Sequence, residues 1–153
     1  MVIGIGTFLF LIFGNYAKEV ELDKEKVQIN SFNQKFLKYE NSDNVTIHDI
    51  ITLANFAIEN NKKYELSNND SGNEATLYVQ VIANFSTSTS SNRKEDLTLI
   101  DKNGNPMLNY TEIIEHNSYD KQKENSQILY RCKKINISKI TKRVYSIEFE
   151  KIR

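Results

Sequence analysis

The chain has 153 residues, of which 39% are hydrophobic and 26% charged, and its 20 basic residues balance 20 acidic ones. This composition excludes a disordered tail or a charged coat, and the length predicts one globular domain with a real core. Zero net charge and only short basic pairs argue against nucleic acid as a partner, because phosphate binding needs a concentrated basic field. The single cysteine, Cys132, cannot form an internal disulfide, and we expect a buried, inert thiol.

The N-terminal segment is strongly apolar. Residues 2–13 read VIGIGTFLFLIF, without a charged side chain, and the first charge is Lys18. A helix needs about 20 apolar residues to span a bilayer, and residues 1–17 cover only about 25 Å at the helical rise. Tyr16 as an interfacial anchor and Lys18 by snorkelling recover part of that deficit.

Two other interpretations of this segment remain open. A cleaved signal peptide fits the apolar length, but it requires a basic region before the run. A buried core helix also fits so short a run, although a small domain can hardly enclose a helix that is apolar on every side. We expect residues 1–17 to be a single-pass membrane anchor. Residues 18–153 should then form a single α+β domain outside the cytoplasm.

The segment after the anchor predicts a continuous amphipathic helix. Neither Pro nor Gly occurs in residues 15–40, and apolar side chains recur there at helical spacing. We therefore expect the membrane helix to continue as an amphipathic helix to about Tyr39. Phe32 and Phe36 lie four residues apart on one side of it, and we expect both to be buried against the sheet that follows.

A second, shorter helix is predicted from a start signal and an apolar face. Thr46 is the expected N-cap, with Asp49 at the third helical position as a capping-box variant. Isoleucine and alanine residues form a continuous face along residues 47–59. The turn-forming residues 41–44 separate the two helices.

Beyond this helix the apolar period changes to two, which indicates strands. Residues 75–85 carry the strongest strand signal, because they are rich in β-branched and aromatic side chains. The sequence Asp-Lys-Asn-Gly-Asn-Pro at residues 101–106 predicts a turn. The predicted strands are 63–66, 75–85, 97–100, 128–137 and 143–152, and residues 111–116 form a short helix or strand. Two N-terminal helices followed by an antiparallel β-sheet make the expected fold class α+β.

One loop has the spacing of a calcium site. Five side chains occupy positions 1, 3, 5, 9 and 12 of a calcium-loop pattern: Asp101, Asn103, Asn105, Asn109 and Glu112. At position 6, where the pattern requires a glycine in a sharp turn, Pro106 fixes φ near −65°. A hairpin turn is therefore the preferred interpretation, and cation binding by the Asp101–Glu112 loop stays open.

Chemical motifs are otherwise missing from the sequence. His116 lies near Glu112 and Glu115, but the spacing is not that of HExxH, and neither histidine has a second ligand at useful spacing. There is no nucleophile elbow, phosphate loop or dinucleotide fingerprint. The sequence thus predicts no enzyme and assigns no catalytic, cofactor-binding or metal-binding residue.

A resemblance adds to these expectations. Phe32-Asn33-Gln34-Lys35-Phe36, Tyr39-Glu40 and residues 45–60 (VTIHDIITLANFAIEN) give an FN..F..Y segment before a V..(L/I)I....N helix. This pattern resembles small single-span type IV pilin-like, or pseudopilin-like, proteins of low-GC Gram-positive bacteria. An AT-rich codon bias towards Asn, Lys and Ile also favours a bacterial source. The resemblance implies a helix packed on an antiparallel sheet, membrane anchoring, and assembly with itself or with other membrane or pilus proteins.

The expected function is therefore a membrane-anchored extracytoplasmic structural or interaction protein, with a pilin-like or pseudopilin-like subunit as its more specific form. Its partners are the membrane, through the N-terminal helix, and other protein subunits. The alternative is a membrane-tethered ligand-binding module of unknown ligand. No cofactor is expected.

Overall fold

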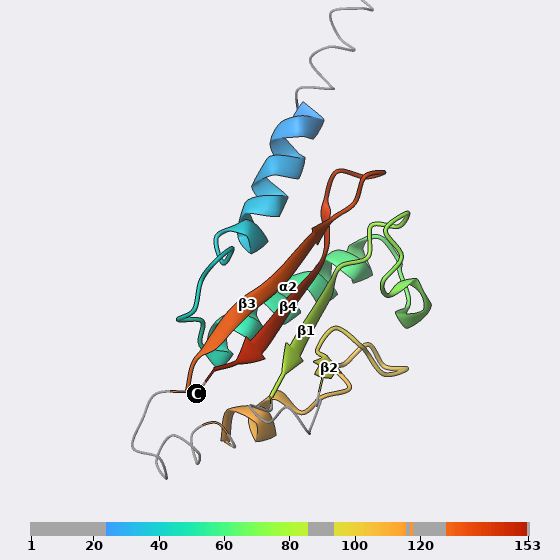
Figure 1. Ribbon diagram of the computed structural model, residues 1–153. Helices are drawn as coiled ribbons and strands as arrows, with labels where there is room; N and C mark the ends of the chain where they lie inside the picture. The colour runs from blue at the N-terminus through green and yellow to red at the C-terminus, as the bar shows by residue number, and fades with distance from the viewer. Residues whose placement is uncertain (1–23, 86–93, 116, 118–127, 153) are drawn as a thin grey trace, which may run out of the picture.

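Two long helices precede the sheet in the computed structural model, which describes residues 24–85, 94–115, 117 and 128–152 (Figure 1). The first is helical over its described residues 24–37, and the second, α2, spans Ile47–Lys63. Among the described residues, no helix is long and apolar enough to cross a membrane. The predicted anchor, residues 1–17, lies outside the described residues.

The start of α2 confirms the predicted capping box. The Asp49 N–H donates to the Thr46 hydroxyl oxygen at 3.2 Å, and the Thr46 N–H donates to the Asp49 carboxylate at 3.0 Å. Two backbone N–H groups at the helix start, which have no partner within the helix, thereby gain a hydrogen bond. The helix continues one turn beyond the predicted end, because Asn60 and Asn61 at that end are buried and bond to the backbone of a neighbouring segment.

The sheet has four strands in the order β2-β1-β4-β3. Their bounds are Gln80–Asn84 for β1, Lys94–Asp96 for β2, Tyr130–Ile137 for β3 and Val144–Lys151 for β4. The outer pairs β1–β2 and β3–β4 are antiparallel, but the central pair β1–β4 is parallel. The α+β class is confirmed, whereas the predicted antiparallel sheet is wrong at its centre. The alternation of apolar and polar residues along a strand indicates which side chains are buried. It does not indicate whether the neighbouring strand runs parallel or antiparallel.

Two predicted strands are wrong in extent or type. Residues 63–66 end α2 and turn the chain, with Glu65 at φ 55°. Of the predicted strand 75–85, only β1 joins the sheet. The preceding Leu77 and Val79 bond through their backbones to asparagine side chains of α2. Those side chains supply the partners that a neighbouring strand would otherwise provide.

The segment after β1 also differs from expectation. Residues 97 and 98 form a turn after β2, because the Asp96 carboxylate accepts a bond from the Thr98 N–H at 2.8 Å and bends the chain. Of the predicted strand 97–100, Ile100 forms an isolated bridge with Pro106. Residues 110–115 are helical, which resolves the ambiguity of that segment in favour of a helix. A short 3₁₀ helix, η1, spans Asn68–Asp70. Strands β3 and β4 lie within their predicted ranges.

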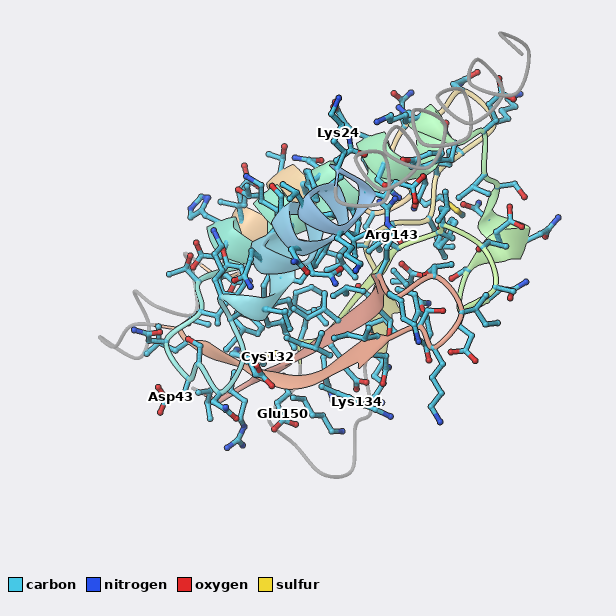
Figure 2. All side chains as sticks on the ribbon, turned by 90° about the horizontal axis from the view of Figure 1, so that it is seen from above. Lys24, Asp43, Cys132, Lys134, Arg143 and Glu150 are labelled. Carbon is cyan, nitrogen blue, oxygen red and sulfur yellow. The ribbon has the colours of Figure 1, made fainter. Side chains whose placement is uncertain are left out.

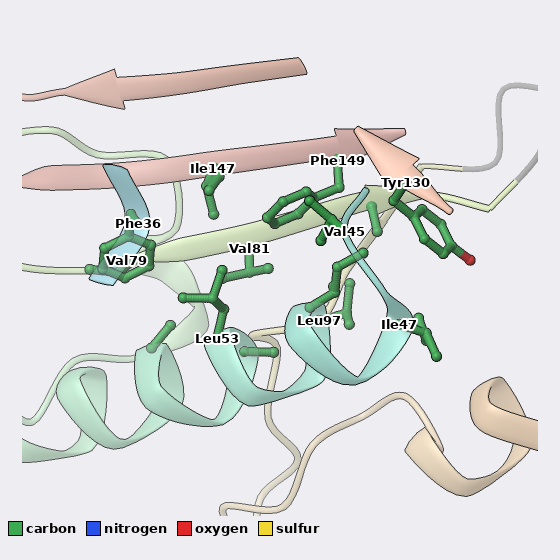
Figure 3. Close-up of a cluster of buried hydrophobic side chains, with 14 of the residues drawn as sticks. Phe36, Val45, Ile47, Leu53, Val79, Val81, Leu97, Tyr130, Ile147 and Phe149 are labelled. Carbon is green, nitrogen blue, oxygen red and sulfur yellow. The ribbon is translucent and has the colours of Figure 1, made fainter. Parts of the chain in front are cut away.

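Both long helices cover the same face of the sheet (Figure 2). The core fills the space between α2 and the buried face of β1 and β4 (Figure 3). The opposite face carries charged side chains, including Lys134 and Glu150, which point away from the helices. On it, Lys94 pairs with Glu148 and Arg131 pairs with Glu150, each at 2.6 Å. The domain therefore has two layers, and one face of its sheet is solvated.

The first helix is half embedded. Phe36 is fully buried, as predicted, and its ring lies 5.4 Å from that of Phe32 and 5.8 Å from that of Phe56. Phe32 is only partly buried, and it packs against α2 and Arg143 more than against the sheet. Residues 24–28 of the same helix are all exposed. The helix therefore enters the domain by its C-terminal half.

Candidate functional site

The predicted calcium loop is closed on itself as a hairpin turn. One carboxylate oxygen of Asp101 accepts bonds from the N–H groups of Asn103 and Asn105 at 2.8 and 2.9 Å. Ile100 and Pro106 pair across the turn, as the hairpin interpretation requires. These backbone donors, that of Asn105 foremost, lower the pKa of Asp101. One oxygen of the Asp101 carboxylate is thus used by the turn.

The other two members of the pattern lie at the start of the helix that follows and within it. The Asn109 side chain accepts from the N–H groups of Thr111 and Glu112 at 3.1 and 3.4 Å, so it caps the helix of residues 110–115. Glu112 lies on that helix and faces a cavity. Among the described residues, no group of three or more His, Cys, Asp or Glu side chains is placed to hold a metal ion.

This cavity, of about 220 Å³, lies where β4 ends. Its lining combines apolar and polar side chains from five separate segments: Phe85, Glu95, Leu108, Asn109, Glu112, Ile113, Asn117, Tyr130 and Lys151. Aromatic and aliphatic groups lie there together with two carboxylates and an ammonium. Such a mixture suits a small, partly apolar molecule with a polar group.

The cavity is held in shape by its own hydrogen bonds. The Tyr130 hydroxyl donates to the Asn117 amide oxygen at 3.0 Å, and the Asn117 amide donates to the carbonyl of Ile113 at 2.9 Å. The Phe85 ring meets Tyr130 edge-to-face at 6.1 Å. These contacts connect β3, the 110–115 helix and the end of β1. No spacing in the sequence indicated the site, because its residues are remote along the chain.

A second, more open depression of about 950 Å³ lies at the other end of β4, between the first helix and the end of α2. Arg143 is its central side chain. The guanidinium stacks over the Phe32 ring at 3.9 Å and donates to the side-chain amide oxygen of Asn60 at 2.9 Å and to the Tyr64 hydroxyl at 3.3 Å. The hydrogen bond from Arg143 lowers the pKa of Tyr64. Arg143 thus joins the first helix, α2 and β4.

The asparagines of the pilin-like pattern have structural roles here. The Asn33 amide donates to the Lys142 carbonyl at 3.0 Å and accepts from the Val144 N–H at 2.8 Å. Asn60 donates to the Leu77 carbonyl at 2.9 Å. Both satisfy backbone groups of segments that are distant along the chain, and Asn60 also lines the depression around Arg143. No family model matches the chain, and no curated protein or solved structure is similar enough to match it.

Proposed function

We propose that this protein is a membrane-anchored structural or interaction protein, with residues 1–17 as its single-pass anchor and its α+β domain outside the cytoplasm. The observation that carries the proposal is an uncharged, apolar run joined to a helix that leaves the domain. Residues 2–13 contain no polar group stronger than a threonine hydroxyl, so a bilayer is a favourable environment for them.

The shape of the first helix supports a tether. Its C-terminal half is fixed by the buried Phe36 and by the two bonds of Asn33. Its first described turns have no apolar cover, and Val27 is 67% exposed. A helix that is buried at its C-terminal end and exposed at its first described turns is suited to connect the domain to the segment that precedes it.

The more specific form of the proposal is a pilin-like or pseudopilin-like subunit. It draws on the resemblance of residues 32–40 and 45–60 and on the exposed first turns, which leave a helix face open to neighbouring subunits. Crosslinking of the full-length protein in its native membrane tests this form. Oligomers that disappear when Val27 is changed to glutamate support it, and a protein that stays monomeric contradicts it.

Membrane fractionation tests the anchor. The full-length chain should pellet with membranes and resist alkaline carbonate, whereas a chain that starts at Lys18 should remain in the supernatant. A full-length double variant, Leu9→Lys with Leu11→Lys, is the matched control. Each lysine in the centre of a spanning helix costs about 3 kcal/mol of insertion free energy. Wild-type protein that stays in the supernatant without detergent would exclude the anchor.

Sidedness needs its own experiment. Protease added to intact, wall-stripped cells should digest the domain and leave the anchor. A domain that is protected until the membrane is lysed would reverse the orientation. Labelling of Cys132 is a weak reporter for this purpose, because burial raises the pKa of its thiol to about 11.

The cavity at the end of β4 favours a second candidate, a membrane-tethered ligand-binding module. A cavity of about 150 Å³ is large enough for benzene, so about 220 Å³ admits a slightly larger molecule. The carboxylate of Glu112 favours an amine. Benzylamine should raise the melting temperature of the wild type and should do so less for Glu112→Gln. Equal shifts in both proteins, or none in either, would remove this candidate.

A further inference from the structure

The chain enters the domain at the end where β3 turns into β4. Asn33 on the first helix bonds to Lys142 and Val144 at that hairpin. Further along the helix, the Tyr39 ring packs edge-to-face on Phe149, deeper along β4, at 6.0 Å. The helix therefore runs inward from the hairpin, and its first turns extend from the domain at the hairpin end (Figure 1). The described part of the helix therefore begins on this side of the domain (Figure 1).

The hairpin tip combines exposed apolar and basic side chains. We call the tip patch the four exposed residues Ile137, Lys139, Ile140 and Lys142. Ile137 is 47% exposed and Ile140 is 64% exposed. The surrounding sequence, residues 133–147, contains five basic residues and no acidic one. Acidic residues on the elements packed beside the hairpin are Glu74, whose carbonyl accepts from Ser138, and Glu25 and Glu59, which line one depression with Thr141 and Arg143.

The tip has a fixed conformation. Ser138, which is buried, donates from its hydroxyl to the Glu74 carbonyl at 2.7 Å. The same oxygen accepts bonds from the N–H groups of Ile140 and Thr141, both at 3.1 Å. Ile140 is thus presented outward by a turn whose backbone groups are satisfied. A single exposed isoleucine needs no explanation, but two on a basic tip beside the tether do.

The tether is short enough to keep this tip within reach of the bilayer. Six residues, 18–23, lie between Ala17 and Lys24, and the helix continues for about 13 Å from Lys24 to Asn33 at the hairpin. A chain from Ala17 to Asn33 would span about 24 Å as one helix and at most about 40 Å with residues 18–23 extended. A tether of this length holds the hairpin at a high effective concentration beside the lipid surface. Isoleucine side chains favour the boundary between headgroups and acyl chains, and lysines favour anionic headgroups.

We propose that the tip patch is a membrane-contact surface of this protein. Ile137 and Ile140 enter the interface of an anionic bilayer, and Lys139 and Lys142 contact phospholipid phosphates. The inference rests on the proposed anchor and adds a second point of attachment, which fixes the orientation of the domain. Each lysine close to such a surface is worth about fivefold in partitioning, from roughly 1 kcal/mol per basic residue.

The test places a fluorescent probe at the tip of the full-length protein. In a Cys132→Ser background, bimane is attached to Ile140→Cys or, as the control, to Thr111→Cys. Position 111 is the control because its helix lies at the other end of β4 from the tip. That helix lines the same cavity as Lys151, which is about 23 Å along the strand from Val144. The proteins are reconstituted into phosphatidylcholine–phosphatidylglycerol vesicles that carry a spin-labelled lipid as quencher.

The bimane at position 140 should be quenched by the lipid and that at position 111 should not. Quenching at position 140 should fall several-fold with Lys139→Glu and Lys142→Glu, or in phosphatidylcholine alone. Equal quenching at both positions overturns the proposal. So does an absence of quenching at position 140 in protein that still floats with the vesicles, and in that case the anchor stands. Protein that does not float with vesicles overturns the anchor and the tip contact together.

Discussion

Replacing Asn33 by leucine should be one of the most damaging changes to the first helix. The Asn33 side chain is only 7% exposed, and its amide holds two backbone groups of the β3–β4 hairpin, 109 and 111 residues away in sequence. Leucine keeps the branched shape of asparagine and is somewhat larger, so the change removes two hydrogen bonds and leaves no cavity. The perturbation removes the polar link between the helix and the hairpin.

The two lost bonds are unequal. The bond from the Val144 N–H is buried, and an unsatisfied buried donor costs about 1–3 kcal/mol. Lys142 is exposed, so water can replace the bond to its carbonyl, and that loss is worth about 1 kcal/mol. The sum, roughly 2–4 kcal/mol, is a large part of the 5–15 kcal/mol that stabilises an ordinary domain. For a chain of this size it lowers the melting temperature by roughly 4–16 °C.

Urea and thermal unfolding of a chain starting at Lys18, followed by circular dichroism, measures this effect. Asn30→Leu is the matched control, because Asn30 lies on the same helix and is exposed. The control should stay within about 0.5 kcal/mol of the parent. If Asn33→Leu also stays within that margin, or if both variants lose the same stability, the hydrogen-bonded link between helix and hairpin does not stabilise the fold.

Three further outcomes are expected. Phe36→Ala should cost about 3–5 kcal/mol in urea unfolding, and Val27→Ala on the exposed turn should cost almost nothing; similar losses would contradict the burial of Phe36. Cys132 should react slowly with a maleimide at neutral pH and quickly in denaturant, because burial raises the pKa of its thiol to about 11; equal rates would place the thiol at the surface. Burial raises the pKa of Tyr110 to about 12, above the unfolded value near 10, so the folded state keeps this proton longer. Its contribution to stability is complete below pH 10 and is lost as the pH rises to 12, and Tyr110→Phe should flatten that decline in urea unfolding; an unchanged decline would assign it to other groups, such as Tyr78.

The candidate cavity could not have been predicted from the sequence. In the sequence, Glu112 stands out only beside His116 and as the last position of a calcium pattern, and Tyr130 only as part of a strand. They share one cavity because the 110–115 helix lies where β3 begins and β4 ends. Two members of the calcium pattern have local structural roles. Asp101 and Asn109 have the spacing of ligands, but each bonds to the nearest backbone N–H groups and shapes a turn or a helix start.

Features that depend on neighbours along the chain could be predicted from the sequence. The capping box of Thr46 and Asp49 acts within one helical turn, and the period of α2 and the alternation of β4 record which side chains are buried. Only the tertiary structure decided the parallel pairing of β1 with β4, because strand direction depends on the path of the long connection between them. It also decided that Asn33 and Asn61 would be buried. Their amides bond to Val144 and Val79 across distant parts of the chain, and a buried polar side chain is stable only when such partners have been brought to it.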